Sequence, residues 1–79
     1  MRSCGLCGSP KLTLVLTYHF GGQAPSLAIP MCDECYMAAA DMALLERRGL
    51  VPRSSTLVPW RDWKEPLTSN VMVLTYDPR

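Results

Sequence analysis

Four cysteines are the residues of this chain whose spacing most clearly indicates chemistry. They form two CxxC motifs, CGLC at residues 4–7 and CDEC at residues 32–35, and the chain holds no other cysteine. Two such motifs in one short chain are typical of a tetrahedral metal ion bound by four thiolates. The pattern therefore predicts a structural Zn²⁺ site, closed to substrates, with the ligands Cys4, Cys7, Cys32 and Cys35.

Two disulfides and an iron–sulfur centre are the alternative uses of these cysteines. A disulfide within a CxxC motif closes a tight, strained loop, and redox motifs of this kind normally belong to a βαβ unit. No parallel-sheet pattern accompanies either motif here. No signal peptide precedes Cys4, and no apolar run approaches the roughly 20 residues that span a bilayer. We therefore expect a cytoplasmic zinc protein, without a membrane partner.

Chain length and charge limit the classes of function. The 79 residues make one domain, whose small apolar core needs a covalent or metal crosslink. The formal net charge is +1, and a zinc ion with four deprotonated thiols changes it to about −1. Proteins that bind nucleic acid through its phosphates are normally strongly basic. The charge therefore disfavours a general nucleic-acid binder.

The residues between the two motifs predict a β-hairpin. Residues 12–20 alternate apolar and polar side chains, as a half-buried strand does, and the GGQ at residues 21–23 signals a turn. Residues 26–31 alternate in the same way. Pro25 and Pro30 lack the N–H that a strand ladder uses, so we expect this second strand to be short or to lie at a sheet edge.

A single helix is expected to begin at the second CxxC motif. Acidic residues suit its first turn, and neither Gly nor Pro interrupts the sequence from Cys32 to Arg48. A continuous helix would turn Cys35, Ala39 and Met42 toward the hairpin, and would place Glu34, Asp41 and Arg48 on the opposite side. We interpret residues 51–66 as a loop with turns. Residues 71–76 are a β-prone run that pairs either with the hairpin or with another chain.

The order of a CxxCG turn at residues 4–8, a hairpin and a helix carrying the CDEC motif resembles the treble-clef zinc finger. Within that superfamily, the CDEC motif and the apolar strand before it are most similar to the N-terminal zinc-binding domain of Clp-type unfoldases. The resemblance covers residues 4 to about 48. It implies a small α+β fold with a zinc knuckle, a β-hairpin and one helix, and it implies docking of adaptors and substrates.

The chain also departs from that family. Its hairpin is longer, and no ATPase module follows, so we do not expect unfoldase activity. We expect residues 1–50 to form the treble-clef zinc-binding domain. Residues 51–79 would be an extension that contains the tryptophans, packs on the same core and ends in a short strand.

Catalysis would need more functional side chains than the sequence offers. HNH-type nucleases share the treble-clef fold but need several histidines around a catalytic metal, and His19 is the single histidine here. Strand alternation places His19 with threonines on the less apolar face, so we expect a surface histidine. A role as an alternative zinc ligand or as a catalytic base remains the alternative. We expect that the protein is not an enzyme.

A partner surface is the remaining candidate for function. The helix carries more apolar residues than one hairpin can cover, and methionine adapts to irregular contacts. Two tryptophans lie three residues apart in a Pro-rich segment, and Trp and Arg dominate binding hot spots. The predicted partner-binding residues are Met37, Leu44, Arg48, Trp60 and Trp63. Self-association through this surface, or its coverage by residues 50–79, are alternatives.

The leading expectation is a non-enzymatic, zinc-stabilised protein-interaction module. It would be a small adaptor or inhibitor, of phage or bacterial type, that docks on a larger protein machine. The alternative is a nucleic-acid-binding zinc finger, because basic residues and tryptophans are interleaved in one segment and could stack on single strands. Those basic residues are Arg47, Arg48, Arg53, Arg61 and Lys64.

Overall fold

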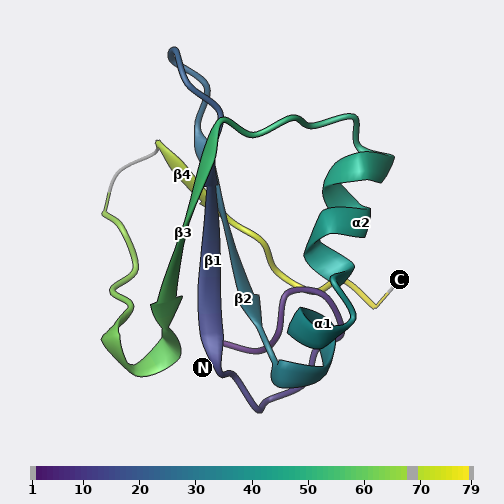
Figure 1. Cartoon of the computed structure of the whole chain (residues 1–79). Coiled ribbons are helices and arrows are strands. Elements are labelled where there is room, and N and C mark those ends of the chain that lie inside the picture. Colours follow the sequence, from purple (N-terminus) through teal and green to yellow (C-terminus); the bar gives the residue numbers. More distant parts are fainter. Residues whose placement is uncertain (1, 68–69, 79) are drawn as a thin grey trace.

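A mixed β-sheet with two short helices on one face organises the chain (Figure 1). The computed structural model describes residues 2–67 and 70–78. In chain order the elements are β1 (Leu14–His19), β2 (Ser26–Met31), α1 (Asp33–Met37), α2 (Ala40–Arg47), β3 (Ser54–Pro59), the 3₁₀ turn η1 (Trp60–Asp62) and β4 (Val71–Val73). This arrangement confirms the predicted small α+β fold.

Strands β1 and β2 form the predicted hairpin. They are antiparallel, with Leu14 opposite Met31 and Tyr18 opposite Leu27. Alternate side chains of both strands point toward the helices and pack against two leucines of α2. The resulting core consists of Leu14, Leu16, Tyr18, Leu27, Ile29, Met31, Leu44 and Leu45. Burial of these apolar side chains is the main driving force that holds the helices on the sheet.

Strand β2 lies inside the sheet, in contrast to the edge position that its prolines suggested. The strand order is β3-β1-β2-β4, and β4 runs parallel to β2 along Ser26 to Ala28. Pro30 lies beyond this pairing, so its missing N–H removes no hydrogen bond from the β2–β4 ladder. The Pro30 carbonyl instead accepts a hydrogen bond from the N–H of Gly5 at 2.8 Å. β4 covers only half of the predicted run 71–76 and pairs within the chain.

The predicted continuous helix is broken at Ala39. This residue has φ 53° and ψ 37°, a left-handed conformation that is uncommon for a residue other than glycine. α1 therefore ends at Met37, and α2 begins at Ala40 in a new direction. The break separates the short helix that carries Cys35 from the helix that packs on the sheet.

The face that α2 turns to the sheet also differs from the prediction. Asp41, Leu44 and Leu45 are buried, whereas Met42 is 63% exposed. The predicted faces assumed one continuous helix, and the break at Ala39 rotates the residues that follow it. The placement of Asp41 on the polar side and of Met42 on the inner side is therefore wrong. The Tyr18 hydroxyl donates a hydrogen bond to the Asp41 carboxylate, which gives the buried acid a polar partner.

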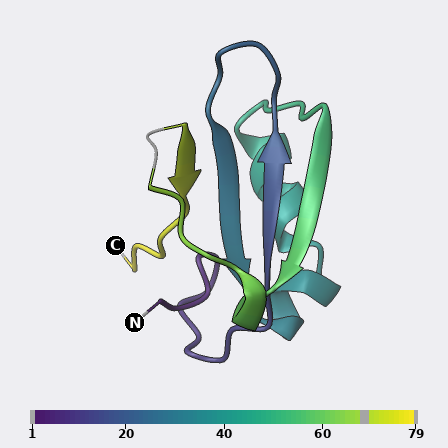
Figure 2. The same cartoon turned by 90° about the vertical axis from the view of Figure 1, so that its left-hand side faces the viewer.

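Residues 51–66, which were predicted to be a loop, contain β3 and η1. β3 is antiparallel to β1 along its whole length, from Leu14 opposite Pro59 to His19 opposite Ser54. The segment after η1 then crosses the sheet face that points away from the helices and reaches β4 at the opposite edge (Figure 2). Val15, Ala28 and Pro30 are buried on this second face. The sheet is therefore covered on both sides.

Candidate metal centre

The first CxxC motif forms a tight turn fastened to the sheet. The N–H of Gly8 donates to the carbonyl of Cys4 at 2.9 Å, and the N–H of Cys4 donates to the carbonyl of Ser9 at 2.8 Å. Gly8 has φ 82°, a conformation that an L side chain rarely adopts. The hydrogen bond from Gly5 to Pro30 ties this turn to the end of β2. The turn buries Cys4 and leaves Cys7 exposed.

The second CxxC motif begins where β2 ends. Cys32 is the extended N-cap residue of α1, and its carbonyl accepts the N–H of Tyr36 at 3.1 Å. Cys35 follows within the first turn of α1, so residues 32 and 35 lie on the same side of the helix start. Asp33 and Glu34 stand between them in the first turn and point to solvent. The sequence prediction of one motif on a turn and one at a helix start is met.

The four sulfur atoms converge on one point. All four Sγ atoms lie within 4.8 Å of one another, and those of Cys7 and Cys32 are 3.7 Å apart. A tetrahedral Zn²⁺ with Zn–S bonds of about 2.3 Å separates its sulfur ligands by about 3.8 Å. All four cysteines are free thiols, whereas a disulfide needs two sulfurs about 2.05 Å apart. The cluster can therefore chelate a metal ion such as zinc.

The electrostatics of the cluster also favour a cation. Burial raises the pKa of the Cys4 thiol, but hydrogen bonds from the backbone of Leu6, Cys32 and Cys7 outweigh it and lower the pKa to about 7. Burial and the neighbouring thiols raise the pKa of Cys35. Burial and the close sulfur atoms thus penalise a negative charge on Cys35. A divalent cation at its centre removes this penalty, because metal binding displaces the thiol protons.

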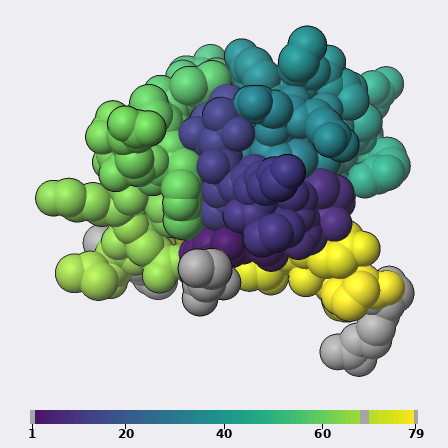
Figure 3. All heavy atoms as spheres, turned by 90° about the horizontal axis from the view of Figure 1, so that it is seen from below, coloured from purple at the N-terminus to yellow at the C-terminus, as the bar shows by residue number. Residues whose placement is uncertain are grey.

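Residues after β4 cover the first CxxC turn. A Cβ atom on Gly5 would lie 2.7 Å from the carbonyl oxygen of Leu74, and one on Gly8 would lie 2.7 Å from the ring of Tyr76. In the space-filling view from below, the segment that follows β4 lies against the N-terminal residues (Figure 3). Both glycines are therefore needed for close packing, and Gly8 is needed for the turn as well. The sequence offered no signal for this contact.

The predicted partner-binding residues fall into three groups. Met37 is 85% exposed, and Arg48, the C-cap of α2, is also exposed. Trp60 and Trp63 are half-buried and stack on each other, with ring centroids 5.9 Å apart and 24° between their planes. Leu44 lies in the core against the sheet and offers no surface to a partner.

His19 sits between two hydroxyl groups on the sheet face opposite the helices. Its Nδ1 lies 3.0 Å from Ser26 Oγ on β2, and its Nε2 lies 3.1 Å from Thr56 Oγ1 on β3. Both ring nitrogens thus have hydroxyl partners. The sulfur cluster that can hold a metal consists of the four cysteines and does not include this histidine.

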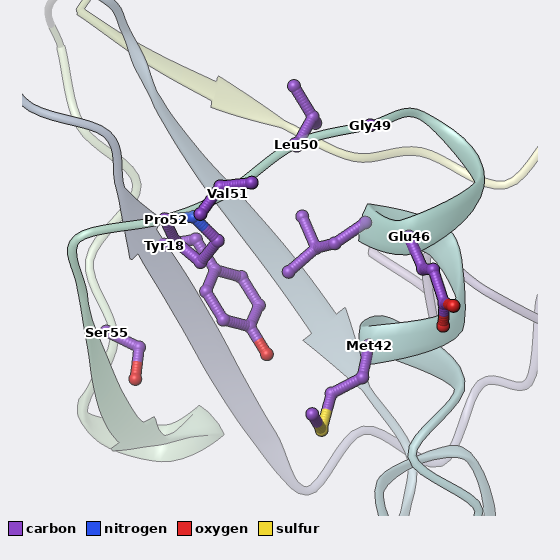
Figure 4. Close-up of a pocket in the computed structure, with 9 residues that line it drawn as sticks. Tyr18, Met42, Glu46, Gly49, Leu50, Val51, Pro52 and Ser55 are labelled. Carbon is purple, nitrogen blue, oxygen red and sulfur yellow. The ribbon is translucent and has the colours of Figure 1, made fainter.

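An apolar groove is the feature that sequence reasoning missed. It has a volume of about 640 Å³ and lies between α2, the segment after it and the strands β1 and β3 (Figure 4). Its walls are Tyr18, Met42, Leu45, Glu46, Gly49, Leu50, Val51, Pro52 and Ser55. The excess of apolar residues on α2 was a signal for an uncovered surface. Its position depended on the break at Ala39 and on β3, neither of which was predicted.

Comparison with protein-family models, with curated proteins and with solved structures finds no match to this chain. Within residues 2–67 and 70–78, no helix has the length and apolar character that crossing a membrane requires. Inference about function therefore rests on the cysteine cluster and on the surfaces that the fold exposes.

Proposed function

We propose that this protein is a non-enzymatic interaction module of the treble-clef type, folded around a structural Zn²⁺ and docking on a larger protein. The observation that carries the proposal is the convergence of four sulfur atoms within 4.8 Å. Four thiolates fill a tetrahedral zinc site and leave no position for water or substrate, so such a site stabilises structure and does not catalyse. A reducing compartment would keep the four thiols able to bind the ion.

The path of the chain supports the treble-clef part of the proposal. A CxxCG turn at residues 4–8 is followed by the β1–β2 hairpin and then by a helix that starts at Cys32. The extension adds two strands to the sheet and covers its second face. It thereby stiffens a domain whose helical part is only two short segments.

Exposed apolar side chains support the interaction part of the proposal. Met37, Met42 and Val51 are 85%, 63% and 84% exposed, and they lie on or beside the helices. Exposed apolar side chains that gather beside a groove mark interaction sites in soluble proteins. Burying them against a partner would stabilise the complex by roughly 25 cal/mol for each Å² of apolar area removed from water.

Nucleic-acid binding is the second candidate, through the basic segment between Arg47 and Lys64. Trp60 and Trp63 stack on each other, and Arg61, which lies between them in the sequence, is exposed. The stacked pair is half-buried, so each ring has less free face for a base than an open aromatic platform provides. This arrangement makes a protein partner the better candidate.

Metal analysis and chelation test the zinc site. Protein purified under reducing conditions should contain one zinc ion per chain, and the Cys32→Ser variant should lose it. Removing zinc with a chelator should abolish the folded circular dichroism and amide NMR spectra, because zinc binding supplies roughly 10–16 kcal/mol in small zinc-finger peptides. A protein that keeps its native spectra without metal would contradict the structural role.

Salt dependence separates the two kinds of partner. Affinity capture from the native host, followed by mass spectrometry and nucleic-acid analysis, supplies the partner for measurement. A complex held by apolar contacts should change little between low and moderate salt, whereas one with several phosphate contacts should weaken steeply. A steep salt dependence with captured RNA or DNA would replace the first proposal by the second.

A further inference from the structure

We propose that β3 binds an extended segment of a partner protein by strand addition, and that this segment carries alternating apolar residues between acidic flanks. The inference rests on the proposed function and deepens it, because it names the docking surface and the chemistry of the partner. It is carried by the backbone of β3, by the groove beside it and by the charges at its two ends.

The backbone of β3 presents unused hydrogen-bonding groups at the sheet edge. The N–H of Trp60 donates to the carbonyl of Thr13 at 2.9 Å, in register with the β1–β3 pairing. Because hydrogen-bonded residues alternate along an antiparallel strand, Val58 and Thr56 also bond to β1. The N–H and C=O groups of Ser55 and Leu57 must then point away from the sheet. An added strand can pair with both groups of each residue.

Nothing in the described part of the chain covers this edge. β3 pairs with β1 alone, and it is the outermost strand at its side of the sheet (Figure 2). Its sequence SSTLVP contains no charged residue. Proteins usually protect exposed edges with charged side chains, especially lysine, to prevent unwanted pairing. Pro59 provides a C=O but no N–H, so pairing should extend along Ser55 and Leu57 and stop there.

The groove beside β3 determines which side chains the added strand should carry. Ser55 lines the groove, and Leu57, which shares its sheet face, is 47% exposed. Successive side chains of a strand point to opposite faces, so every second residue of an added strand would lie on the side of α2. These residues would pass the small Ser55 side chain and contact Met42 and Val51 (Figure 4). Apolar residues at alternate positions fit this surface.

Basic residues precede and follow β3 in the sequence, and their charges indicate acidic flanks in the partner. Arg53 directly precedes β3, Arg61 lies two residues beyond its end, and Arg48 ends α2. The ion pair between Arg2 and Glu65 includes none of these three arginines. Acidic residues at both ends of an added strand would complement their charges.

A second copy of the chain fits this edge less well. Antiparallel pairing of β3 with its own copy brings Arg53 of one chain near the segment from Pro59 to Arg61 of the other. Like charges close together across an interface are unfavourable, and Pro59 cannot donate to the opposing strand. An acidic segment from a different protein avoids the charge repulsion, and the missing N–H of Pro59 then affects only one end of the pairing.

Selection from a library of random 12-residue peptides displayed on phage, against the zinc-loaded protein, tests the inference. Enriched peptides should share alternating apolar residues with Asp or Glu at the flanks. Binding of one such synthetic peptide should shift the amide NMR signals of Ser55 and Leu57 most strongly. Enriched peptides without this pattern, no enrichment at all, or shifts centred elsewhere would overturn the inference.

Three variants and a matched control separate the edge from the rest of the surface. Leu57→Pro removes an outward N–H together with the exposed leucine side chain, and it should weaken binding of the selected peptide at least about tenfold. Arg61→Glu should weaken it and reduce its salt dependence, and it serves as the test should Leu57→Pro fail to fold. Met72→Lys, on the opposite edge strand, is the matched control for Leu57→Lys, and only Leu57→Lys should abolish binding. Equal effects at residues 57 and 72 would contradict the inference.

The outcomes distinguish this inference from the proposed function. Peptides that bind at Trp60 and Trp63 would leave an interaction module without strand addition at β3. A protein that selects no peptide and captures nucleic acid would refute both. Sedimentation that shows a dimer dissociated by Leu57→Lys would assign the edge to a second copy of the chain, and the proposed acidic partner would be wrong.

Discussion

The hydroxyl of Tyr18 on β1 donates a hydrogen bond to the carboxylate of Asp41 in the first turn of α2, and both side chains are buried. Asp41 is the one buried acidic residue among those the structure describes. Its place at the start of α2 puts its charge near the positive end of the helix dipole. This pair therefore fixes α2 on the sheet at a polar point within an otherwise apolar contact.

Substitution of Tyr18 by phenylalanine should destabilise the protein by about 1–3 kcal/mol, because it leaves a buried carboxylate without its donor. Asp41→Asn keeps an acceptor and should cost less. Urea denaturation of the zinc-loaded variants measures both values. Tyr36→Phe is the matched control, since Tyr36 is exposed and should lose little stability. Similar losses at Tyr18 and Tyr36 would show that the hydrogen bond contributes nothing.

Alkaline pH should weaken the fold through the same tyrosine. Burial and the hydrogen bond to Asp41 raise the pKa of Tyr18 above the unfolded value of about 10. The folded state then holds the proton more tightly than the unfolded state does. Its stabilising contribution is complete below about pH 10 and is lost as the pH rises further. Above about pH 10 the wild-type protein should lose stability more steeply than Tyr18→Phe, because the variant lacks the ionising hydroxyl. Urea denaturation of both proteins at a series of pH values measures the difference.

Ala39→Gly should stabilise the protein, although glycine usually weakens helical segments. A left-handed conformation costs an L residue about 1–2 kcal/mol, and the extra entropy of glycine in the unfolded chain offsets about 0.5–1 kcal/mol of that. The expected net gain is up to about 1.5 kcal/mol in the free energy of unfolding. Ala43→Gly, at an exposed position inside α2, should instead lose about 1 kcal/mol. Losses at both positions would show that α1 and α2 form one helix in solution.

Gly8→Ala should weaken metal binding more than Gly49→Ala does. Both glycines have positive φ, but only at Gly8 would the new Cβ meet another group, the ring of Tyr76. Competition with a metal-binding dye measures the affinity for zinc in each variant. In a Tyr76→Ala background the clash is absent, so the additional loss caused by Gly8→Ala should become smaller. Additive losses would mean that Tyr76 does not lie on this turn.

Local sequence signals were sufficient for the cysteine cluster that can hold a metal ion and for the first half of the sheet. The CxxC spacing identified the four cysteines that converge, and period-two alternation identified the β1–β2 hairpin. Both features depend on residues close together in sequence. The helix start at Cys32 was also predicted, because the chemistry of capping is local.

Long-range contacts were not accessible in this way. Ser54, Ser55 and Pro59 gave β3 the composition of a loop, and pairing with β1 overrode that composition. The break at Ala39 has no glycine or proline to mark it, and it exists because α1 must hold Cys35 while α2 packs on the sheet. The groove could not be located before these two elements were known. Leu44 was placed on the surface for the same reason.

The contact between residues 74–76 and the first CxxC turn can form only late in protein synthesis, after all four cysteines have been made. The four ligands are present once residue 35 has been made, so a metal ion can bridge the two motifs early. The covering of Gly5 and Gly8 by Leu74 and Tyr76 must wait for some forty further residues. Contacts of such long sequence separation form slowly. The nascent chain therefore passes through a stage in which the turn around Cys4 is open, and metal exchange should be fastest then.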